Sequence, residues 1–165
     1  RDGRPSSMRK EYDFSKATVI TMFLLPEINL KLRPRLLELK PGTRIVSNTF
    51  TMGEWEPDYE VTTEENWNSW NKAMMWIIPA KAEGYWKLGQ NELSFRQQYQ
   101  MVFGNLLSNS KSEPVSDGRL NGNEITFRIG DDLYIGHVNG NTISGTVTNT
   151  GMGTKSDWIA TKTGN

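Results

Sequence analysis

The sequence has no cysteine and a single histidine, His137. Without cysteine the chain forms no disulfide and offers no thiolate to a metal, and one histidine excludes a histidine-based metal cluster. We therefore expect no metal centre. No apolar run comes near the roughly 20 residues that a membrane-spanning helix needs, and residues 1–16 are polar, unlike a secretory signal. We expect a cytoplasmic protein that does not enter a membrane.

An excess of charge of one sign is also absent, because 19 Lys and Arg balance 19 Asp and Glu. A neutral chain has no general attraction to nucleic acid or to an anionic membrane, so we expect neither as a partner. The sequence has no P-loop and no serine in a nucleophile-elbow motif, which excludes the enzyme classes that depend on them. The pair Asp131-Asp132 follows a glycine and is typical of a turn.

The chain is organised around the stretch from Ala17 to Phe50. Residues 17–25 form an apolar, β-branched run, typical of a strand that is covered on both faces. Residues 44–50 form a second β-rich run, and two such runs joined by a helix predict a βαβ unit with parallel strands. Because this unit needs further parallel neighbours, we expect it to be the later part of a larger doubly wound sheet. The earlier strands are absent from this chain or supplied by another.

The segment between the two runs, about Glu27–Leu39, predicts a helix. Its apolar residues recur at steps of four, four and three, which places them on one helical face: Ile28, Leu32, Leu36 and Leu39. Pro34 either begins the regular part of this helix or kinks it. Lys40-Pro41-Gly42 then ends it, since proline and glycine commonly follow the last helical turn.

This stretch resembles a known family through Pro26-Glu27, Leu32-Arg33, Leu36, Leu39-Lys40-Pro41-Gly42 and Arg44-Ile45-Val46-Ser47. It resembles the fourth strand, the following helix and the fifth strand of class I S-adenosylmethionine-dependent methyltransferases. The non-SET protein-lysine methyltransferases are the most similar branch. The resemblance covers roughly the first third of the chain. It implies a Rossmann-like fold, S-adenosyl-L-methionine as cofactor and protein lysine as acceptor.

The resemblance also implies which residues lie beside the transferred methyl group. Cofactor contacts are implied for Phe23, Leu24, Leu25 and Pro26, and substrate contacts for Glu27, Asn48, Thr49, Phe50 and Trp55. No catalytic residue follows from it. In the non-SET histone enzymes an asparagine with nearby aromatics stands at this strand end, whereas here no asparagine precedes Pro26. An ordinary place in the strand core is the alternative role for residues 23–25.

Two features that hold the cofactor in this fold are missing from the chain. They are a glycine-rich turn after the first strand and an acidic residue at the end of the second. Gly151-Met152-Gly153 opens no helix and does not replace the first of them. We therefore expect a C-terminal fragment of a methyltransferase that neither binds the cofactor nor acts alone. The bare strand edge at residues 17–25 predicts a homodimer or strand exchange.

Two antiparallel strands are expected next, at Tyr59–Thr63 and Ala73–Pro79, matching the sixth and seventh strands of the methyltransferase fold. The stretch between them is ambiguous, because Thr63 followed by two glutamates is also typical of a helix start. From Gly84 onward the pattern turns to short alternating runs, typical of an antiparallel meander that forms a small barrel or half-barrel. The expected strands are Gly84–Leu88, Glu92–Phe103, Val115–Asn121, Glu124–Gly130, Leu133–Asn139, Thr142–Thr148 and Asp157–Lys162, the last of which closes the meander.

An internal repeat marks this β region, because Asn121 and Asn139 each begin an Asn-Gly-Asn turn. Asn-Gly between alternating runs predicts a type I′ hairpin, with positive φ at both central residues. Reused hairpin geometry explains the repeat, and a ligand-lined barrel mouth or an interaction surface is the alternative. The whole chain then reads as α+β: a lead-in over 1–16, a methyltransferase portion over 17–82 and an antiparallel β domain over 83–165.

Tryptophan is unusually frequent. We expect Trp76, Trp86 and Trp158 in the core, and Trp55, Trp67 and Trp70, which lie in polar contexts, beside a binding cleft or an interface. Aromatic platforms on a barrel also suggest a rival function from another class. In that reading the β region is a non-enzymatic module that binds a sugar or an apolar ligand.

Overall fold

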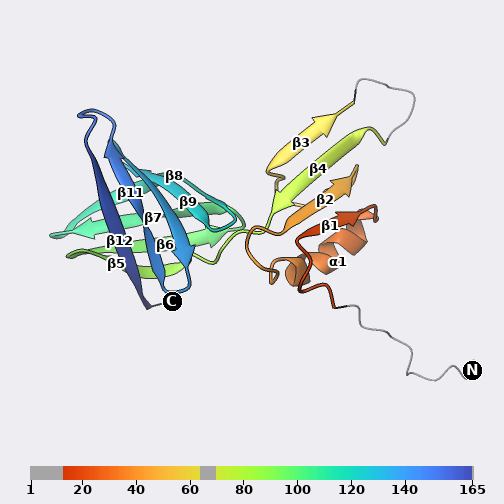
Figure 1. The fold of residues 1–165 in the computed structure, drawn as a ribbon, viewed down its shortest axis with the longest axis horizontal. Helices are drawn as coiled ribbons and strands as arrows, with labels where there is room; N and C mark the ends of the chain where they lie inside the picture. Colours follow the sequence, from red (N-terminus) through yellow and green to blue (C-terminus); the bar gives the residue numbers. More distant parts are fainter. Residues whose placement is uncertain (1–12, 64–69, 165) are drawn as a thin grey trace, which may run out of the picture.

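A computed structural model describes residues 13–63 and 70–164 and shows two parts, a four-stranded sheet with one helix and a closed eight-stranded barrel (Figure 1). Most of the expected lead-in and Trp67 lie outside the described residues. No helix in the described part of the chain is long and apolar enough to cross a bilayer.

The sheet part contains β1 (Val19–Met22), α1 (Pro26–Leu36), β2 (Arg44–Asn48), β3 (Tyr59–Thr62) and β4 (Lys72–Ile77). The strand order is β1-β2-β4-β3. β1 and β2 are parallel, with α1 between them in sequence, as the two β-rich runs predict. β4 is antiparallel to both β2 and β3, so the two predicted antiparallel strands are confirmed.

The expectation that the first strand is covered on both faces is wrong. β1 has only four residues, and Val19 is 44% exposed, while Phe23 and Leu25 lie beyond its end and are exposed. The buried side chains of β2 and β4, such as Ile45 and Trp76, all lie on one face, in a core that Leu36 of α1 shares. Because one helix covers one face, the other face stays open within residues 13–63 and 70–164.

The helix is shorter than predicted and ends at Leu36. It begins at Pro26, a position where the missing N–H of proline has no cost. Pro34 lies inside its last turn rather than at its start. Of the predicted apolar face, Leu36 is buried and Ile28 is exposed. After the helix, Gly42 has φ of +89°, the left-handed conformation that favours glycine, and the chain turns there into β2.

The barrel is an up-and-down meander whose strands pair in sequence order. They are β5 (Gly84–Leu88), β6 (Asn91–Gln98), β7 (Met101–Ser108), β8 (Lys111–Asn121), β9 (Glu124–Ile129), β10 (Asp132–Asn139), β11 (Thr142–Asn149) and β12 (Lys155–Gly164). Each strand is antiparallel to the next, and β12 pairs back onto β5. The predicted meander is therefore confirmed as a closed barrel, and its last predicted strand closes it.

The single strand predicted over Glu92–Phe103 is wrong, because a two-residue turn at Tyr99 and Gln100 divides it. Tyr99 takes a φ of +54°. Positive φ usually falls on glycine or asparagine, and the sequence has neither at this turn. After this turn Met101 and Phe103 are exposed, and Val102 between them is buried.

The type I′ prediction for the Asn-Gly-Asn turns is also wrong. Asn121 pairs with Glu124, so Gly122 and Asn123 are the two central residues. Only Gly122, at +60°, has a positive φ, and Gly140 of the second turn, at +57°, repeats this. Glycine at the first central position alone is the requirement of a type II′ turn.

Aromatic side chains fill the barrel. Phe127 stacks on Tyr134 with 4.8 Å between ring centroids, and Phe95 and Trp158 pack edge-on against Phe127. Trp86 is fully buried in the same core. Trp76, Trp86 and Trp158 are thus core residues, as predicted. The packed interior argues against an apolar ligand inside the barrel.

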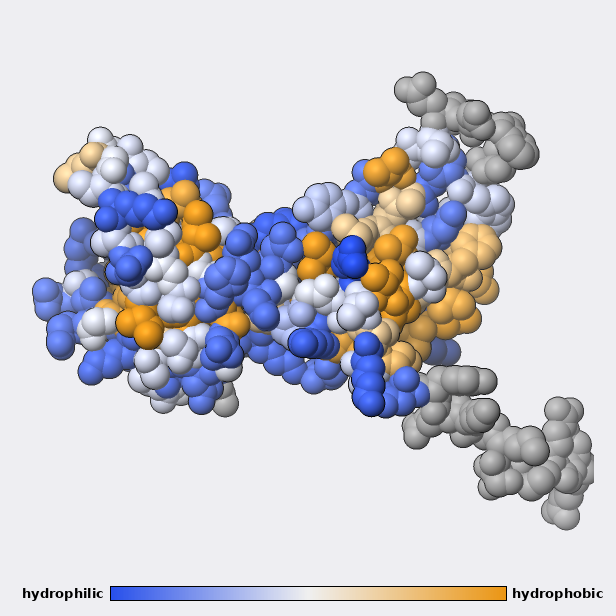
Figure 2. Space-filling model, viewed as in Figure 1, coloured by the Kyte–Doolittle hydropathy of each residue, from blue (hydrophilic) through white to orange (hydrophobic). Residues whose placement is uncertain are grey.

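The two parts touch near the amino end of β2. Figure 1 shows the barrel beside this end of the sheet, and β4 runs toward it. Gly122 of the β8–β9 turn lies against Gly42, because a Cβ on Gly122 would be 3.2 Å from the Gly42 Cα. Arg119 of the barrel forms an ion pair of 2.7 Å with Asp58. The carboxyl ends of β1 and β2 point away from the barrel, and Figure 2 shows apolar residues gathered on the sheet part.

Candidate functional site

Three aromatic side chains meet at the carboxyl ends of the two parallel strands. Phe23 follows β1, Phe50 lies just beyond β2, and Trp70 precedes β4. Their ring centroids are 5.8 Å (Phe23–Phe50), 5.3 Å (Phe23–Trp70) and 5.7 Å (Phe50–Trp70) apart. Phe23 is 59% and Trp70 50% exposed. Because doubly wound sheets bind ligands at the carboxyl ends of their strands, this aromatic cluster marks the candidate site.

The other predicted cofactor contacts lie next to the aromatic cluster in sequence. Leu24 is partly buried against the sheet core, whereas Leu25 is exposed directly before the helix. Pro26 and Glu27 form the exposed first turn of α1. A carboxylate there is favoured by the positive end of the helix dipole.

Asn48 and Thr49, two of the predicted substrate contacts, close the end of β2. The Asn48 Oδ1 accepts a hydrogen bond of 2.7 Å from the Thr49 hydroxyl. Thr49 takes a φ of +65°, and its N–H donates to the carbonyl of Lys72 at 2.7 Å. This bond ties the strand end to β4, so the chain turns sharply and delivers Phe50 to the aromatic cluster.

Trp55 is not where a substrate contact requires it. Its side chain is fully buried, stacks on Tyr99 with centroids 5.6 Å apart, and donates from Nε1 to Gln100 Oε1 at 2.8 Å. Trp55 therefore belongs to the core and to the contact with the barrel, so a substrate contact or a place beside an open cleft is wrong, whereas the alternative of an interface fits its contacts with Tyr99 and Gln100. The polar neighbours Glu54 and Glu56 concealed this, because they are exposed while Trp55 between them is buried.

Asn29, which the sequence analysis did not single out, supports the site through hydrogen bonds to the backbone at Phe50 and Thr51. It is fully buried, and its Nδ2 donates to the carbonyls of Phe50 and Thr51 at 3.4 and 3.1 Å. Ser47 Oγ also donates to the Phe50 carbonyl, at 2.7 Å. The Asn29 Oδ1 is buried without a hydrogen-bond partner in the described part of the chain. Asparagine seven residues before Leu36, on the same helical face, was the available signal.

An ion pair stands at the other end of the helix. Arg33 Nη1 lies 2.9 Å from Glu54 Oε2 and donates to the Met52 carbonyl at 2.8 Å. The Tyr99 hydroxyl donates to Glu54 Oε1 at 2.7 Å. Hydrogen bonds from Arg33, from its own backbone N–H and from Tyr99 lower the pKa of Glu54 to about 2. Burial, and then the bond to Glu54, raise the pKa of Tyr99.

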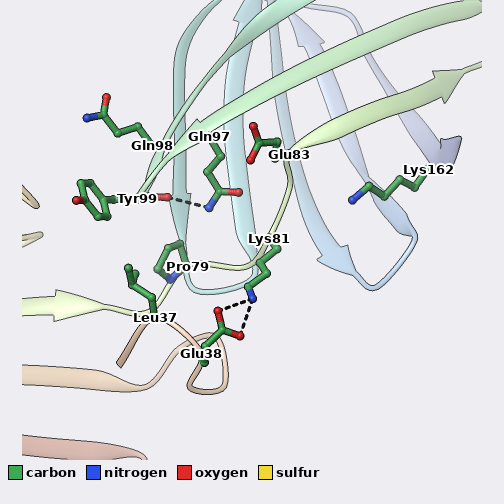
Figure 3. A pocket seen from close by; sticks show the side chains of 9 residues that line it. All are labelled: Leu37, Glu38, Pro79, Lys81, Glu83, Gln97, Gln98, Tyr99 and Lys162. Atoms are coloured by element: carbon green, nitrogen blue, oxygen red, sulfur yellow. Dashed lines mark hydrogen bonds and ion pairs between the residues drawn. The ribbon is translucent and has the colours of Figure 1, made fainter. Parts of the chain in front are cut away.

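A surface cleft of about 660 Å³ lies between the two parts and is lined by Leu37, Glu38, Pro79, Lys81, Glu83, Gln97, Gln98, Tyr99 and Lys162 (Figure 3). Several of its polar groups already have partners. The Lys81 amine lies 2.9 and 2.8 Å from the two Glu38 oxygens, and the Gln97 amide nitrogen donates to the carbonyls of Ala80 and Tyr99. Within residues 13–63 and 70–164, no group of His, Asp and Glu is placed to hold a metal ion.

Comparisons with known proteins find similarity to methyltransferases. Residues 8–59 match a family model described as the ANTKMT methyltransferase domain. A protein-lysine N-methyltransferase of Saccharolobus islandicus (strain REY15A) is 46% identical over 69 residues, which are 41% of this chain and 42% of that protein. The chain thus spans less than half the length of this relative.

A solved structure is also similar, described as an RNA methyltransferase from Salinibacter ruber in complex with S-adenosyl-L-homocysteine. It is 47% identical over 43% of this chain and 44% of its own, with a TM-score of 0.39. The sequence relationships, rather than this low structural score, carry the assignment. Residues 8–59 are thus similar in sequence to a methyltransferase domain, the chain shares 69 aligned residues with a protein-lysine methyltransferase, and a β-barrel follows the matched segment.

Proposed function

We propose that this chain is the C-terminal portion of a class I methyltransferase that uses S-adenosyl-L-methionine and methylates protein lysine. The observation that carries the proposal is the aromatic cluster, which gathers at the carboxyl ends of parallel strands within the family-matched segment. In this proposal β1, α1 and β2 are the later part of a Rossmann-like sheet. The unpaired side of β1 receives its next parallel strand from the rest of the enzyme.

The described residues fit only one side of the cofactor. Phe23 and Leu25 offer an exposed apolar surface beside the strand ends, suited to the region around a methyl group. The chain has no glycine-rich turn after a first strand and no acidic residue at the end of a second, which this fold uses for the rest of the ligand. When bound, S-adenosyl-L-methionine supplies an electrophilic methyl group. The remaining contacts must come from the missing part of the sheet.

The residues of this chain act on the acceptor. Aromatic faces attract the ammonium of a lysine by cation–π interaction, and Glu27 at the helix start adds a negative charge. These contacts hold the ammonium and raise the pKa of the lysine amine. An apolar wall also removes water, and in this proposal desolvation outweighs that attraction in the closed site and lowers the pKa, which favours the neutral nucleophile. The Asn48 side chain, whose oxygen accepts from the Thr49 hydroxyl, still has its amide nitrogen to donate to an acceptor protein. The balanced charge of the chain favours protein over RNA as the acceptor.

The test is a methyl-transfer assay on the full product of the gene, with a lysine-rich protein and an RNA as separate acceptors. The variant Phe23→Ala removes a ring that is 59% exposed in the aromatic cluster, and the matched control Phe103→Ala removes one that is 50% exposed on the barrel. We expect kcat/KM to fall at least roughly tenfold for Phe23→Ala alone. Equal activity of both variants contradicts the acceptor site, and transfer to RNA alone contradicts lysine.

Calorimetry tests the fragment part of the proposal separately. We expect the isolated chain to show no binding of S-adenosyl-L-methionine at micromolar concentrations, because it lacks the cofactor cradle. Micromolar binding by this chain contradicts that part. A carbohydrate module, the rival function, predicts a change in tryptophan fluorescence when sugars are added to the same sample.

A further inference from the structure

We propose that the barrel positions the candidate site through the crossover segment, residues 49–58, which connects β2 to β3. This inference rests on the proposed function for its biological meaning, but its physical content does not. The barrel lies at the amino end of β2, so it is too far from the strand ends to form the acceptor pocket itself. Its influence on that pocket must pass through the chain that joins the two places.

The crossover segment has irregular backbone whose carbonyl groups are bound by side chains. From α1, Asn29 donates to the carbonyls of Phe50 and Thr51, and Arg33 donates to that of Met52. Irregular backbone in a core is stable only when its polar groups find such partners. At its first end, the segment is therefore fixed to the helix directly below the aromatic cluster.

The barrel holds the second end of the crossover segment. Gln100, which is 2% exposed, donates from Nε2 to the Glu56 carbonyl at 2.8 Å and accepts from Trp55 Nε1 at 2.8 Å. The Tyr99 ring stacks on Trp55, and its hydroxyl binds Glu54. Tyr99 and Gln100 both belong to the β6–β7 turn of the barrel. This turn therefore supplies the Gln100 amide, which clamps the segment through one donated and one accepted hydrogen bond, and the Tyr99 ring, which stacks on Trp55.

The two sets of contacts meet at Arg33 and Trp55. The Arg33 guanidinium lies 2.9 Å from Glu54 and 5.4 Å from the centroid of the Tyr99 ring, so it contacts both the segment and the barrel turn. The Trp55 carbonyl accepts from Trp76 Nε1 of β4 at 2.7 Å. A chain of packed and hydrogen-bonded groups thus runs from Gln100 to the carbonyl of Phe50. We assign Tyr99 and Gln100 as positioning residues for the aromatic cluster.

Hydrogen exchange measured by mass spectrometry tests this on the chain as it stands. The variant Gln100→Ala removes the clamp, and Gln98→Ala, in an exposed position just before the same turn, is the matched control. We expect Gln100→Ala to speed amide exchange roughly tenfold across the whole crossover segment, including residues 49–53 next to the aromatic cluster. The reason is that the lost hydrogen bonds lower the free energy needed for the segment to open locally. Gln98→Ala leaves the segment unchanged, and residues 124–149 of the barrel keep their protection in both variants.

Faster exchange confined to residues 54–58 overturns the proposal, because the barrel then stabilises only the residues that it contacts and does not influence those next to the aromatic cluster. Unchanged exchange at 49–53 does the same. If Gln100→Ala unfolds the barrel, Tyr99→Phe replaces it, since this change keeps the ring on Trp55 and removes only the bond to Glu54. The indole resonance of Trp70 gives a second readout, and we expect Tyr99→Phe to shift it. Neither readout depends on cofactor or acceptor, so a failed methyl-transfer assay leaves this test intact.

Discussion

At the scale of single residues, contacts between the two parts depend on a few polar side chains that the sequence presents as ordinary surface groups. Glu54 is an example, since it lies in a turn-rich loop and is exposed, yet it binds both Arg33 and the Tyr99 hydroxyl. Residues of this kind depend on distant partners, 45 positions away for Glu54 and Tyr99. No local pattern in the sequence reports such a partner.

The Glu54 ion pair makes stability depend on pH. Its folded-state pKa is about 2, below the ordinary 4.5, so its contribution is present above pH 4.5 and is lost as the pH falls from 4.5 toward 2. We expect the difference in urea midpoint between the wild type and Glu54→Gln to shrink over that window. Glu92→Gln, on the exposed face of β6, is the control for the change in charge. A difference that stays constant from pH 5 to pH 2 would contradict this assignment.

The residues of the site also divide into those that local sequence can place and those that depend on distant partners. Phe23, Phe50 and their neighbours follow apolar strands, so the strand ends were enough to predict where they lie, and their contacts with cofactor and substrate stay a prediction. Asn29 was missed, because a buried asparagine is recognisable only once its carbonyl partners are known. Trp55 was predicted beside a cleft because its neighbours in sequence are polar, yet those neighbours are exposed and Trp55 is buried.

At the scale of elements, periodicity predicted the βαβ order and six of the eight barrel strands near their observed positions. It failed at Tyr99, where a tight turn has neither glycine nor asparagine and the alternation of apolar residues continues through it. A turn that is held by contacts with another part of the molecule needs no local signal. Tertiary contacts therefore determine such a turn, and a short stretch of sequence does not contain them.

The β7–β8 turn offers a direct test of turn chemistry. Asn109 and Ser110 both have positive φ, at +46° and +69°, the pattern of a type I′ turn. Ser110→Gly relieves the strain at the second position, and we expect it to stabilise the chain by about 0.5 kcal/mol in urea unfolding. Gly130→Ala, at φ +55° with open space around it, is the opposite case, and we expect a loss of about 1 kcal/mol. A lower midpoint for Ser110→Gly would rule out this reading of the turn.

At the scale of the whole molecule, the sheet has two open sides within the described residues, the outer edges of β1 and β3. Unpaired strand edges recruit further strands. Since β1 is the edge that the proposed methyltransferase sheet extends, we expect the isolated chain to form a homodimer or exchange strands through it.

Light scattering over a wide concentration range measures this association. We expect Val19→Lys on β1 to weaken it, because a charge on an edge strand opposes pairing, while Val61→Lys on β3 has little effect. The two side chains are 44% and 66% exposed, so neither change disturbs the core. A monomer at all concentrations, or a dimer broken only by Val61→Lys, would show that β1 is not the contact.

The closure of the barrel has one more consequence. Tyr85, near the start of β5, pairs with Gly164, at the end of β12, so the chain enters and leaves the barrel about one strand spacing apart, roughly 5 Å. A module whose entry and exit are neighbours can be spliced into a surface loop of an unrelated host without stretching either. The same barrel can therefore be joined to another domain with little strain, which makes it a practical module for protein engineering.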